Sequence, residues 1–371
     1  MVALKVNKQL IDTPALVIDR SQLIENICNM QAYANAAGVA VRPHIKTHKC
    51  ANIARLQKEH GAIGVCVTKV SEAEQLVKSG VGGILITSPV VTELKITRLL
   101  SLLPQAHDLM VVVDSAVNAG QLNEACKHLG MSLNCLVDID PGVHRTGVSY
   151  KEALTLARVI HGHDYLKLAG IQCYAGNLQH VHHFSDRRRV SQAAMEKAAG
   201  VKKKLISDGL PCPILTGTGT GTFDIDSSVE GVTEIQPGSY TVMDQEYAAI
   251  EGSEGGGFRH FQHAMTQLTT VISGNHGSHI TVDAGLKALY TDNTRPRIIS
   301  HPGLEYDWAG FGDEHGRVTA LPGFSLPIVG EVLELVVPHC DPTINLFDYF
   351  YIVENGQVID KWPINLRGCS Q

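Results

Sequence analysis

The sequence predicts a (β/α)8 barrel of the TIM type followed by a C-terminal all-β domain. Two observations support this fold class: apolar runs alternate with helical patterns from about residue 13 to 250, and helical patterns become rare after residue 251. Strands that alternate with helices pair in parallel, and eight such units favour a closed barrel over its main rival, an open doubly wound sheet. A chain of 371 residues also has room for two domains.

Short runs rich in apolar and β-branched residues are the expected barrel strands. They cover residues 13–19, 39–47, 62–68, 82–88, 109–115, 132–140, 166–174 and 212–218. The segment after the first run opens with Ser21, a good N-cap residue, and ends near Gly38, which is typical of a helix. We therefore expect the barrel to occupy residues 13–250.

A glycine-rich stretch, EGSEGGGF, begins at residue 251 and separates the two patterns. Beyond it the chain consists mainly of strand-like runs. One of them, YIVENGQVID, holds an Asn-Gly pair between alternating residues and predicts a β-hairpin. We expect residues 251–371 to form the β domain, with residues 1–12 adding a strand to it.

Composition argues against several classes of protein. The formal charge is −6, and the sequence contains no basic stretch typical of a nucleic-acid-binding surface. No run reaches the roughly 18 apolar residues that a membrane span needs, and the first ten residues lack the features of a secretory signal. The nine cysteines are scattered without a Cys-x-x-Cys pair, which indicates reduced thiols and a cytoplasmic setting.

Basic residues gather at the end of the second run. In an extended strand Arg42, His44 and Lys46 share one face, and barrel enzymes hold their active sites at the carboxyl ends of the strands. Three basic groups on an inward face favour a bound anion or cofactor, and crowding by cations favours the neutral amine that attacks an aldehyde. From spacing alone, a basic strand end or a simple phosphate contact is an equal alternative.

Three segments carry a family resemblance: TPALVID at residue 13, RPHIKTHK at residue 42 and GVCVTKVSEAE at residue 64. They resemble the D-threonine aldolase and D-serine dehydratase family, which also includes 3-hydroxy-D-aspartate aldolases and is similar in its barrel to the alanine racemases. The resemblance implies a pyridoxal 5'-phosphate enzyme in which Lys46 is the Schiff-base lysine and His44 contacts the cofactor. Thr68 departs from the pattern, because the family often has Gln there.

Two further segments end later strands of the predicted barrel. By the resemblance, Arg145 of DIDPGVHRTGV approaches the pyridine nitrogen of the cofactor, and Tyr174 of GIQCYAG lies beside the cofactor. A permanent cation next to that nitrogen would keep it unprotonated. Without the resemblance, Arg145 would be read as a loop arginine paired to Asp138 or Asp140.

A run of alternating Thr and Gly, TGTGTGT, begins at residue 216. Glycines let the backbone approach an anion, threonine hydroxyls add donors, and barrel enzymes often bind phosphate after strands seven and eight. Such runs are common, so the position and the match to the family segments decide the interpretation. We expect Thr220, Gly238, Ser239 and Tyr240 to bind the cofactor phosphate.

The segment HCDPT in the second domain holds candidate metal ligands. In an extended backbone His339 and Asp341 face one side, and an imidazole with a carboxylate suits Mn²⁺ or Mg²⁺, with Zn²⁺ as a third candidate. A surface turn is the alternative. The metal-dependent aldolases of the family carry His-x-Asp followed by Pro-Thr, whereas the dehydratases carry His-x-Cys, so the resemblance favours an aldolase.

Together these features predict an aldolase that cleaves D-3-hydroxy amino acids, of the D-threonine type, to glycine and an aldehyde. The alternative is a D-serine or D-3-hydroxyaspartate dehydratase that gives a 2-oxo acid and ammonia. A non-catalytic pyridoxal-phosphate carrier would lack the β domain, and an alanine racemase would need a catalytic tyrosine that no motif marks. By analogy with related enzymes we expect a cytoplasmic homodimer whose partner is the small-molecule substrate, with no nucleic acid and no membrane.

Overall fold

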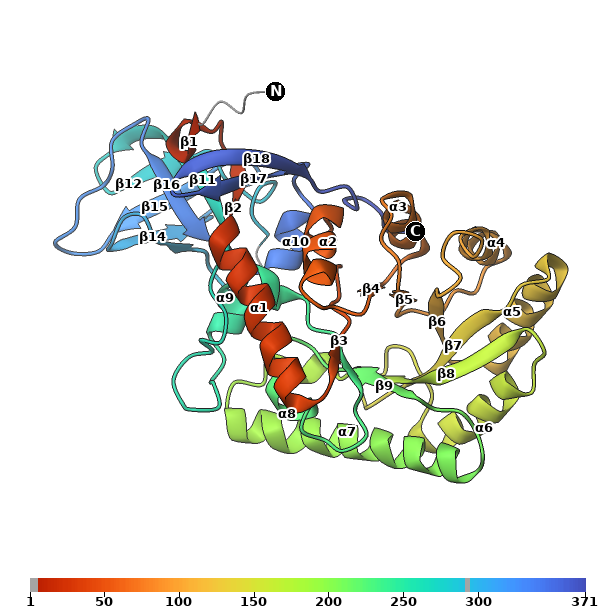
Figure 1. The fold of residues 1–371 in the computed structure, drawn as a ribbon. Coiled ribbons are helices and arrows are strands. Elements are labelled where there is room, and N and C mark those ends of the chain that lie inside the picture. Colours follow the sequence, from red (N-terminus) through yellow and green to blue (C-terminus); the bar gives the residue numbers. More distant parts are fainter. Residues whose placement is uncertain (1–5, 291–293) are drawn as a thin grey trace. The chain divides into compact units, whose positions relative to one another are not determined.

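The computed structural model describes residues 6–290 and 294–371, which divide into two compact units (Figure 1). The barrel unit comprises residues 30–46, 53–238 and 369–371. The sheet unit comprises residues 1–29, 47–52 and 239–368, of which residues 1–5 and 291–293 lie outside the described part.

The barrel unit contains a parallel sheet of eight strands among the described residues. In spatial order they are β4 (Val65–Val67), β5 (Ile84–Ile86), β6 (Met110–Val113), β7 (Leu133–Ile139), β8 (Leu166–Cys173), β9 (Ile214–Gly217), β10 (Glu234–Ile235) and β3 (Ala40–Val41). A parallel bridge between His44 and Cys66 joins the two ends of the sheet and closes the barrel. Strands β4, β5 and β6 are entirely apolar and buried, as expected when a sheet is covered on both faces.

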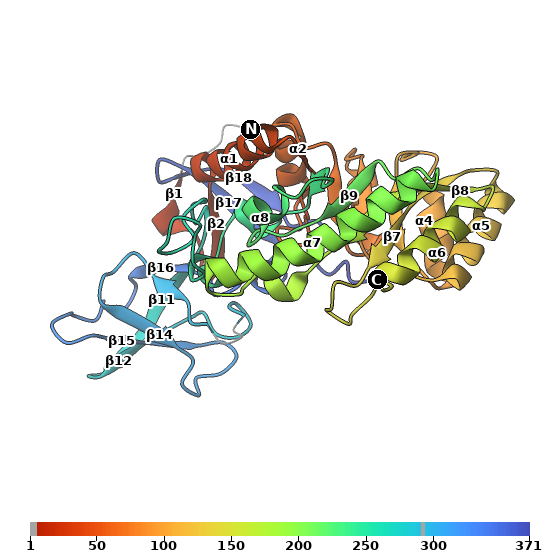
Figure 2. The ribbon, with the colours of Figure 1, turned by 90° about the horizontal axis from the view of Figure 1, so that it is seen from below.

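Helix α1 (Arg20–Ala37) precedes the barrel strand β3, and one helix follows each barrel strand from β3 to β9. The helices that follow the strands are α2 (Ala51–Glu59), α3 (Val70–Lys78), α4 (Glu93–Ser101), α5 (Ala116–Leu129), α6 (Tyr150–His161), α7 (Phe184–Ser207) and α8 (Phe223–Asp226). Helix α6 begins with a capping box in which the Ser149 and Glu152 side chains satisfy each other's backbone amides. Helix α7, the long green helix in Figure 2, packs against β8 and β9.

The sheet unit is built mainly from antiparallel strands. They are β1 (Val6–Asn7), β2 (Ala15–Asp19), β11 (Met265–His276), β12 (His279–Val282), β13 (Arg297–Ile298), β14 (Leu304–Asp307), β15 (Gly316–Ala320), β16 (Val332–Val336), β17 (Tyr349–Glu354) and β18 (Gln357–Pro363). The helical turns α9 (Gln245–Ala248) and α10 (Cys340–Ile344) interrupt them. The predicted hairpin is present: β17 and β18 meet at Asn355 and Gly356, both with positive φ.

The first predicted barrel strand belongs to the other sheet, so that part of the prediction is wrong. Strand β2 pairs with β11 and β17 of the sheet unit, and the barrel's eighth strand is instead β10. An apolar cluster of Ile11, Val17 and Leu268 explains why β2 lies in the sheet unit, because β2 buries its side chains against β11. The main divisions between the compact units lie at residues 29/30 and 238/239, where the sequence analysis expected residues 13 and 250, and residues 47–52 and 369–371 also change unit.

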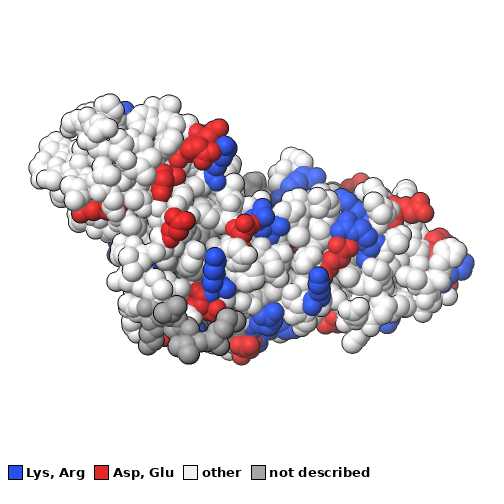
Figure 3. All heavy atoms as spheres, turned by 90° about the horizontal axis from the view of Figure 1, so that it is seen from above, with Lys and Arg blue, Asp and Glu red and all other residues white. Residues whose placement is uncertain are grey.

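The surface carries mixed charge. Basic and acidic side chains are interspersed on the face drawn in Figure 3. Several of them pair, such as Arg98 with Glu74, whose side-chain atoms lie 2.7 Å apart. No helix in the described part of the chain has the length and apolar character that crossing a bilayer requires.

Candidate active site

A cavity of about 300 Å³ lies at the carboxyl ends of the barrel strands. Its lining residues follow the strands or end them, and most are polar: His44, Lys46, Thr68, Lys69, Thr87, Ser88, Arg145, Thr146, Gln172, Tyr174 and Gln236. Four residues singled out from the sequence therefore meet in one cavity, namely Lys46, His44, Arg145 and Tyr174. This is the face at which barrel enzymes place their chemistry.

Lys46 lies in a turn and not in a strand, because β3 ends at Val41. The turn is fixed by His44, whose Nδ1 accepts a hydrogen bond from the Lys46 backbone amide at 3.3 Å. The other ring nitrogen, Nε2, lies 3.0 Å from Thr87 Oγ1, and that hydroxyl donates its own proton to the Val67 carbonyl. The pattern assigns the His44 proton to Nε2, because the Thr87 hydroxyl can only accept there.

Arg42 does not join Lys46, although the sequence predicted a shared face. Its guanidinium makes a two-pronged contact with the Glu234 carboxylate of β10, at 2.8 and 2.9 Å, and both side chains are buried in the barrel. The predicted shared face does not extend to Lys46, because strand pairing continues only as far as the bridge between His44 and Cys66 and residues 45–48 form a turn. Arg42 is therefore not one of the cations near Lys46; the permanently basic residues that line the cavity with it are Lys69 and Arg145.

Arg145 lies on the exposed side of the cavity beside Tyr174, with its guanidinium carbon 5.7 Å from the centre of the tyrosine ring. The alternative of an ion pair with a neighbouring aspartate is not observed. Asp140 instead accepts the amides of Gly142, Val143 and His144, at 2.7–3.1 Å, in a tight loop.

Asp138 is a buried carboxylate beneath the loop that carries Arg145. It accepts hydrogen bonds from Gln172 Nε2 at 2.9 Å and from Thr146 Oγ1 at 2.8 Å. Burial raises the pKa of Asp138 to about 6, although the two hydrogen bonds oppose the rise. Gln172 in turn accepts from Gln236 Nε2 at 3.2 Å, so a chain of polar side chains forms the floor of the cavity.

The residues predicted to bind phosphate fall in both units. Thr220 and Gly238 are buried residues of the barrel unit, and Thr220 belongs to the loop that follows β9. Ser239 and Tyr240 begin the sheet unit in the short helical turn Ser239–Thr241, and both are buried. Their common role in holding one phosphate group remains a prediction.

The predicted metal pair lies in the sheet unit at the start of α10. The extended backbone that the sequence argument assumed ends at His339, because helix α10 begins at the buried Cys340. His339 Nδ1 lies 3.3 Å from the Glu246 carboxylate. Asp341 Oδ1 accepts a hydrogen bond from Ser239 Oγ at 3.4 Å. No cluster of three or more His, Cys, Asp or Glu side chains able to hold an ion occurs among residues 6–290 and 294–371.

Several residues of these two sites were not predicted from the sequence. Thr87 and Gln236 each directly follow a short strand, and Gln172 precedes Tyr174 by two positions on β8. Strand periodicity therefore contained the signal for Gln172, because residues two apart share a face. Glu246 had no local signal, since it lies 93 positions before His339 and only the fold brings them together.

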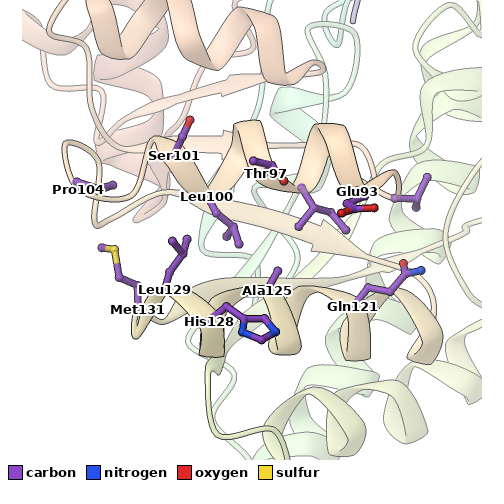
Figure 4. Close-up of a pocket in the computed structure, with 12 residues that line it drawn as sticks. Glu93, Thr97, Leu100, Ser101, Pro104, Gln121, Ala125, His128, Leu129 and Met131 are labelled. Carbon is purple, nitrogen blue, oxygen red and sulfur yellow. The ribbon is translucent and has the colours of Figure 1, made fainter.

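A larger cavity of about 630 Å³ lies on the outside of the barrel, between α4 and α5 (Figure 4). Its lining is mostly apolar and includes Ile96, and Figure 4 shows Leu100 and Leu129 facing the space with His128 at its edge. It contains no lysine and no group of converging polar side chains. The smaller polar cavity at the strand ends is therefore the candidate active site.

Comparisons with known proteins identify the family to which this chain belongs. Residues 18–246 match the family model "Alanine racemase, N-terminal domain", and residues 264–353 match "Putative serine dehydratase domain". The chain is 39% identical to the D-threonine aldolase of an Arthrobacter species, covering 97% of this chain and 94% of that protein. It is 36% identical to the 3-hydroxy-D-aspartate aldolase of Paracoccus denitrificans, covering 96% of this chain and 92% of that protein.

Among solved structures, the fold is similar to the crystal structure of D-threonine aldolase from Filomicrobium marinum. The TM-score is 0.94 at 36% sequence identity, and the match covers 99% of this chain and 98% of that chain. The similarity therefore extends over the barrel strands as well as the second sheet.

Proposed function

The chain belongs to the family of D-threonine aldolases and 3-hydroxy-D-aspartate aldolases and is a lyase, and we propose that it cleaves the Cα–Cβ bond of D-3-hydroxy amino acids with pyridoxal 5'-phosphate and a divalent metal ion. The observation that carries the proposal is the Lys46 side chain in a polar cavity that also holds Arg145 and Tyr174. An amine at the carboxyl end of a barrel strand suits imine formation with an aldehyde cofactor.

The cavity fits such a cofactor in size and in chemistry. A space of about 300 Å³ lies at the lower end of the range for small-molecule sites. Lys46 would hold the aldehyde carbon, and Arg145 would lie against the pyridine nitrogen, with Tyr174 and His44 at the ring. Thr220, Gly238, Ser239 and Tyr240 would hold the phosphate. Pyridoxal phosphate, when bound, withdraws the electron pair that the broken Cα–Cβ bond leaves on Cα.

The donor set in the sheet unit fits a divalent ion at His339 and Asp341. A histidine that ligates a metal commonly donates its other ring proton to a carboxylate, which orients the ring. The Glu246 carboxylate beside His339 Nδ1 supplies that partner and directs the lone pair to Nε2. The carboxylate and the water molecules that would complete the site suit Mn²⁺ or Mg²⁺, whereas the imidazole also suits Zn²⁺, so Zn²⁺ is the third candidate. The ion supplies Lewis acidity toward the substrate's β-hydroxyl group.

The proposed reaction balances as a retro-aldol cleavage. The β-hydroxyl group loses its proton, the Cα–Cβ bond breaks, and the former hydroxyl carbon becomes an aldehyde. Cα then gains a proton, which gives glycine. D-Threonine would yield acetaldehyde, and D-3-hydroxyaspartate would yield glyoxylate.

The deciding experiment assays D-threonine, D-serine and D-3-hydroxyaspartate with Mn²⁺, Mg²⁺ and Zn²⁺ in turn and identifies the products. We expect glycine and an aldehyde, with activity and the visible imine absorbance both lost in Lys46→Ala. The match to a putative serine dehydratase domain keeps a second candidate, the dehydratase. A 2-oxo acid formed from D-threonine without glycine would establish the dehydratase and overturn the aldolase proposal.

We further propose a homodimer that works in the cytoplasm. All nine cysteines carry free thiols, which suits a reducing compartment. Light scattering of the purified protein tests the dimer directly, and a monomeric mass would contradict it.

A further inference from the structure

The glycine-rich loop after β9 rests on two buried side chains from an adjoining part of the barrel unit. Gln179 follows the short helical turn Gly176–Leu178, and Arg187 belongs to the first turns of α7. Gln179 is 1% exposed and Arg187 is fully buried. Neither lines the candidate cavity, and both contact the loop through hydrogen bonds to Gly221.

Gln179 binds the loop with both ends of its amide. Its Oε1 accepts the Gly221 backbone amide at 3.0 Å, and its Nε2 donates to Thr222 Oγ1, also at 3.0 Å. Thr222 is itself held in place, because its hydroxyl donates a hydrogen bond to the buried Asp226 carboxylate at 2.7 Å. The amide of Gly221 is thereby held in one direction.

The glycines of the loop are needed for this contact. A Cβ atom built on Gly219 would lie 2.4 Å from Gln179 Oε1, and one built on Gly221 would lie 2.1 Å from the Gln179 carbonyl oxygen. Side chains at these positions would push the loop away from Gln179. Glycine is therefore required at positions 219 and 221 by the contact with Gln179, in addition to any role of these glycines in binding an anion.

Arg187 holds the same loop from helix α7. Its Nε donates to the Gly221 carbonyl at 2.8 Å, and its Nη1 donates to the Val181 carbonyl at 2.7 Å. A single guanidinium thus ties the loop to the segment that carries Gln179.

We propose that Gln179 and Arg187 are positioning residues that pre-order the loop for the cofactor phosphate, so that they set the preference for pyridoxal phosphate over pyridoxal. The inference rests on the proposed function in requiring that the protein binds this cofactor with its phosphate group at this loop. Binding to a loop that is already ordered avoids the entropy cost of ordering it. Loss of these hydrogen bonds should therefore reduce the contribution of the phosphate group to the binding affinity. Imine formation at Lys46 should be unaffected.

The test compares dissociation constants for pyridoxal phosphate and for pyridoxal in the whole protein, read from imine absorbance. Signal from Lys46→Ala is subtracted to remove imines at other lysines. Gln179→Met keeps the side-chain length but removes the amide group. Arg187→Lys keeps the positive charge but removes the planar guanidinium that donates to two carbonyl groups. Each variant is expected to lower the preference for the phosphorylated cofactor about tenfold, with the affinity for pyridoxal unchanged. Arg189→Lys, an exposed neighbour on α7, is the matched control and should bind as the wild type does.

Two outcomes overturn the inference: folded variants that keep the wild-type preference, or variants that weaken both cofactors equally. A measurement on the wild type decides the question even if a variant does not fold. Hydrogen exchange at Gly221 should be slow before any cofactor is added, and exchange as fast as in an unfolded peptide would refute pre-ordering. If the wild type binds no pyridoxal phosphate at all, the proposed function itself is wrong. This result differs from the two outcomes above, in which the cofactor binds but the loop is not pre-ordered by Gln179 and Arg187.

Discussion

At the scale of single residues, the ion pair between Arg42 and Glu234 makes the barrel interior sensitive to substitution of either residue. Both side chains are buried, and the guanidinium contacts the carboxylate through two nitrogens. Breaking a buried pair by removing one partner leaves an uncompensated charge. Arg42→Met is therefore expected to lower the free energy of unfolding by about 3–5 kcal/mol, measured by urea denaturation.

The double variant Arg42→Met with Glu234→Leu provides the control. Replacing both charges with apolar groups should recover most of the loss, because no charge is left unpaired. A double variant as unstable as the sum of the two single variants would contradict this account.

His44 is predicted to act through two hydrogen bonds that shape the turn of Lys46. His44→Phe keeps a ring but removes the acceptor for the Lys46 amide and the donor to Thr87. At roughly 0.5–1.5 kcal/mol per hydrogen bond, the cofactor-free protein should lose about 1–3 kcal/mol of stability in thermal or urea unfolding. His128→Phe on the exposed face of α5 should change nothing, and a similar loss there would point to a general effect of phenylalanine.

The sequence predicted which residue types gather at the cavity better than it predicted their partners. Arg145 and Tyr174 were predicted from the family resemblance, and Lys46 from its place near a strand end together with that resemblance. The barrel brings these strand ends together at one cavity. The partner of Arg42 could not be predicted, because Glu234 lies 192 positions away in a two-residue strand. The placement of His339 against Glu246 depends in the same way on contacts between distant segments.

At the scale of elements, the pairing of β8 with β9 depends on a glycine. A Cβ atom at Gly217 would lie 1.9 Å from the Cys173 carbonyl oxygen on the neighbouring strand. Gly217→Ala should therefore separate the two strands and cost about 3 kcal/mol or more in the free energy of unfolding. Gly120→Ala, in helix α5 with nothing within 4 Å, is the matched control and should stabilise the protein by about 0.5–1 kcal/mol. Equal effects at the two sites would contradict the steric explanation.

The elements themselves were largely predictable, because strands β3 to β9 fall within the apolar runs of the sequence. Two assignments failed for physical reasons. Strand β2 has the composition of a barrel strand, yet its hydrogen-bonding partners in the other sheet decide its place. Strand β10 has two residues, one of them charged, so no apolar run marks it.

At the scale of the whole molecule, the residues proposed to hold the two cofactors belong to different compact units. Lys46, for pyridoxal phosphate, lies in the barrel unit, and His339 and Asp341, for the metal ion, lie in the sheet unit. Thorough chelation is therefore expected to abolish cleavage of D-threonine while the imine absorbance at Lys46 persists. Adding back Mn²⁺ should restore the activity. Activity that survives chelation would disprove the metal role, and loss of the imine on chelation would show that the metal supports cofactor binding as well.

Stability of the whole molecule should also carry a pH signature from the buried carboxyl group of Asp226. Burial raises the pKa of Asp226 to about 6 from its ordinary 3.8, against hydrogen bonds from Ser191 and Thr222. A raised pKa means that the folded state holds the proton more tightly, so this group stabilises the fold fully below pH 4 and loses that contribution as the pH rises through 6. The shift corresponds to about 3 kcal/mol.

Asp226→Asn removes the titration without removing the polar group. Compared with the wild type, the variant should gain relative stability between pH 4 and pH 7, by up to about 3 kcal/mol in urea denaturation. Asp164→Asn, at an exposed position, serves as the control and should keep the wild-type dependence on pH. If the difference between Asp226→Asn and the wild type is constant across this range, the carboxylate titrates alike in the folded and unfolded states, and burial in the barrel unit does not control its charge.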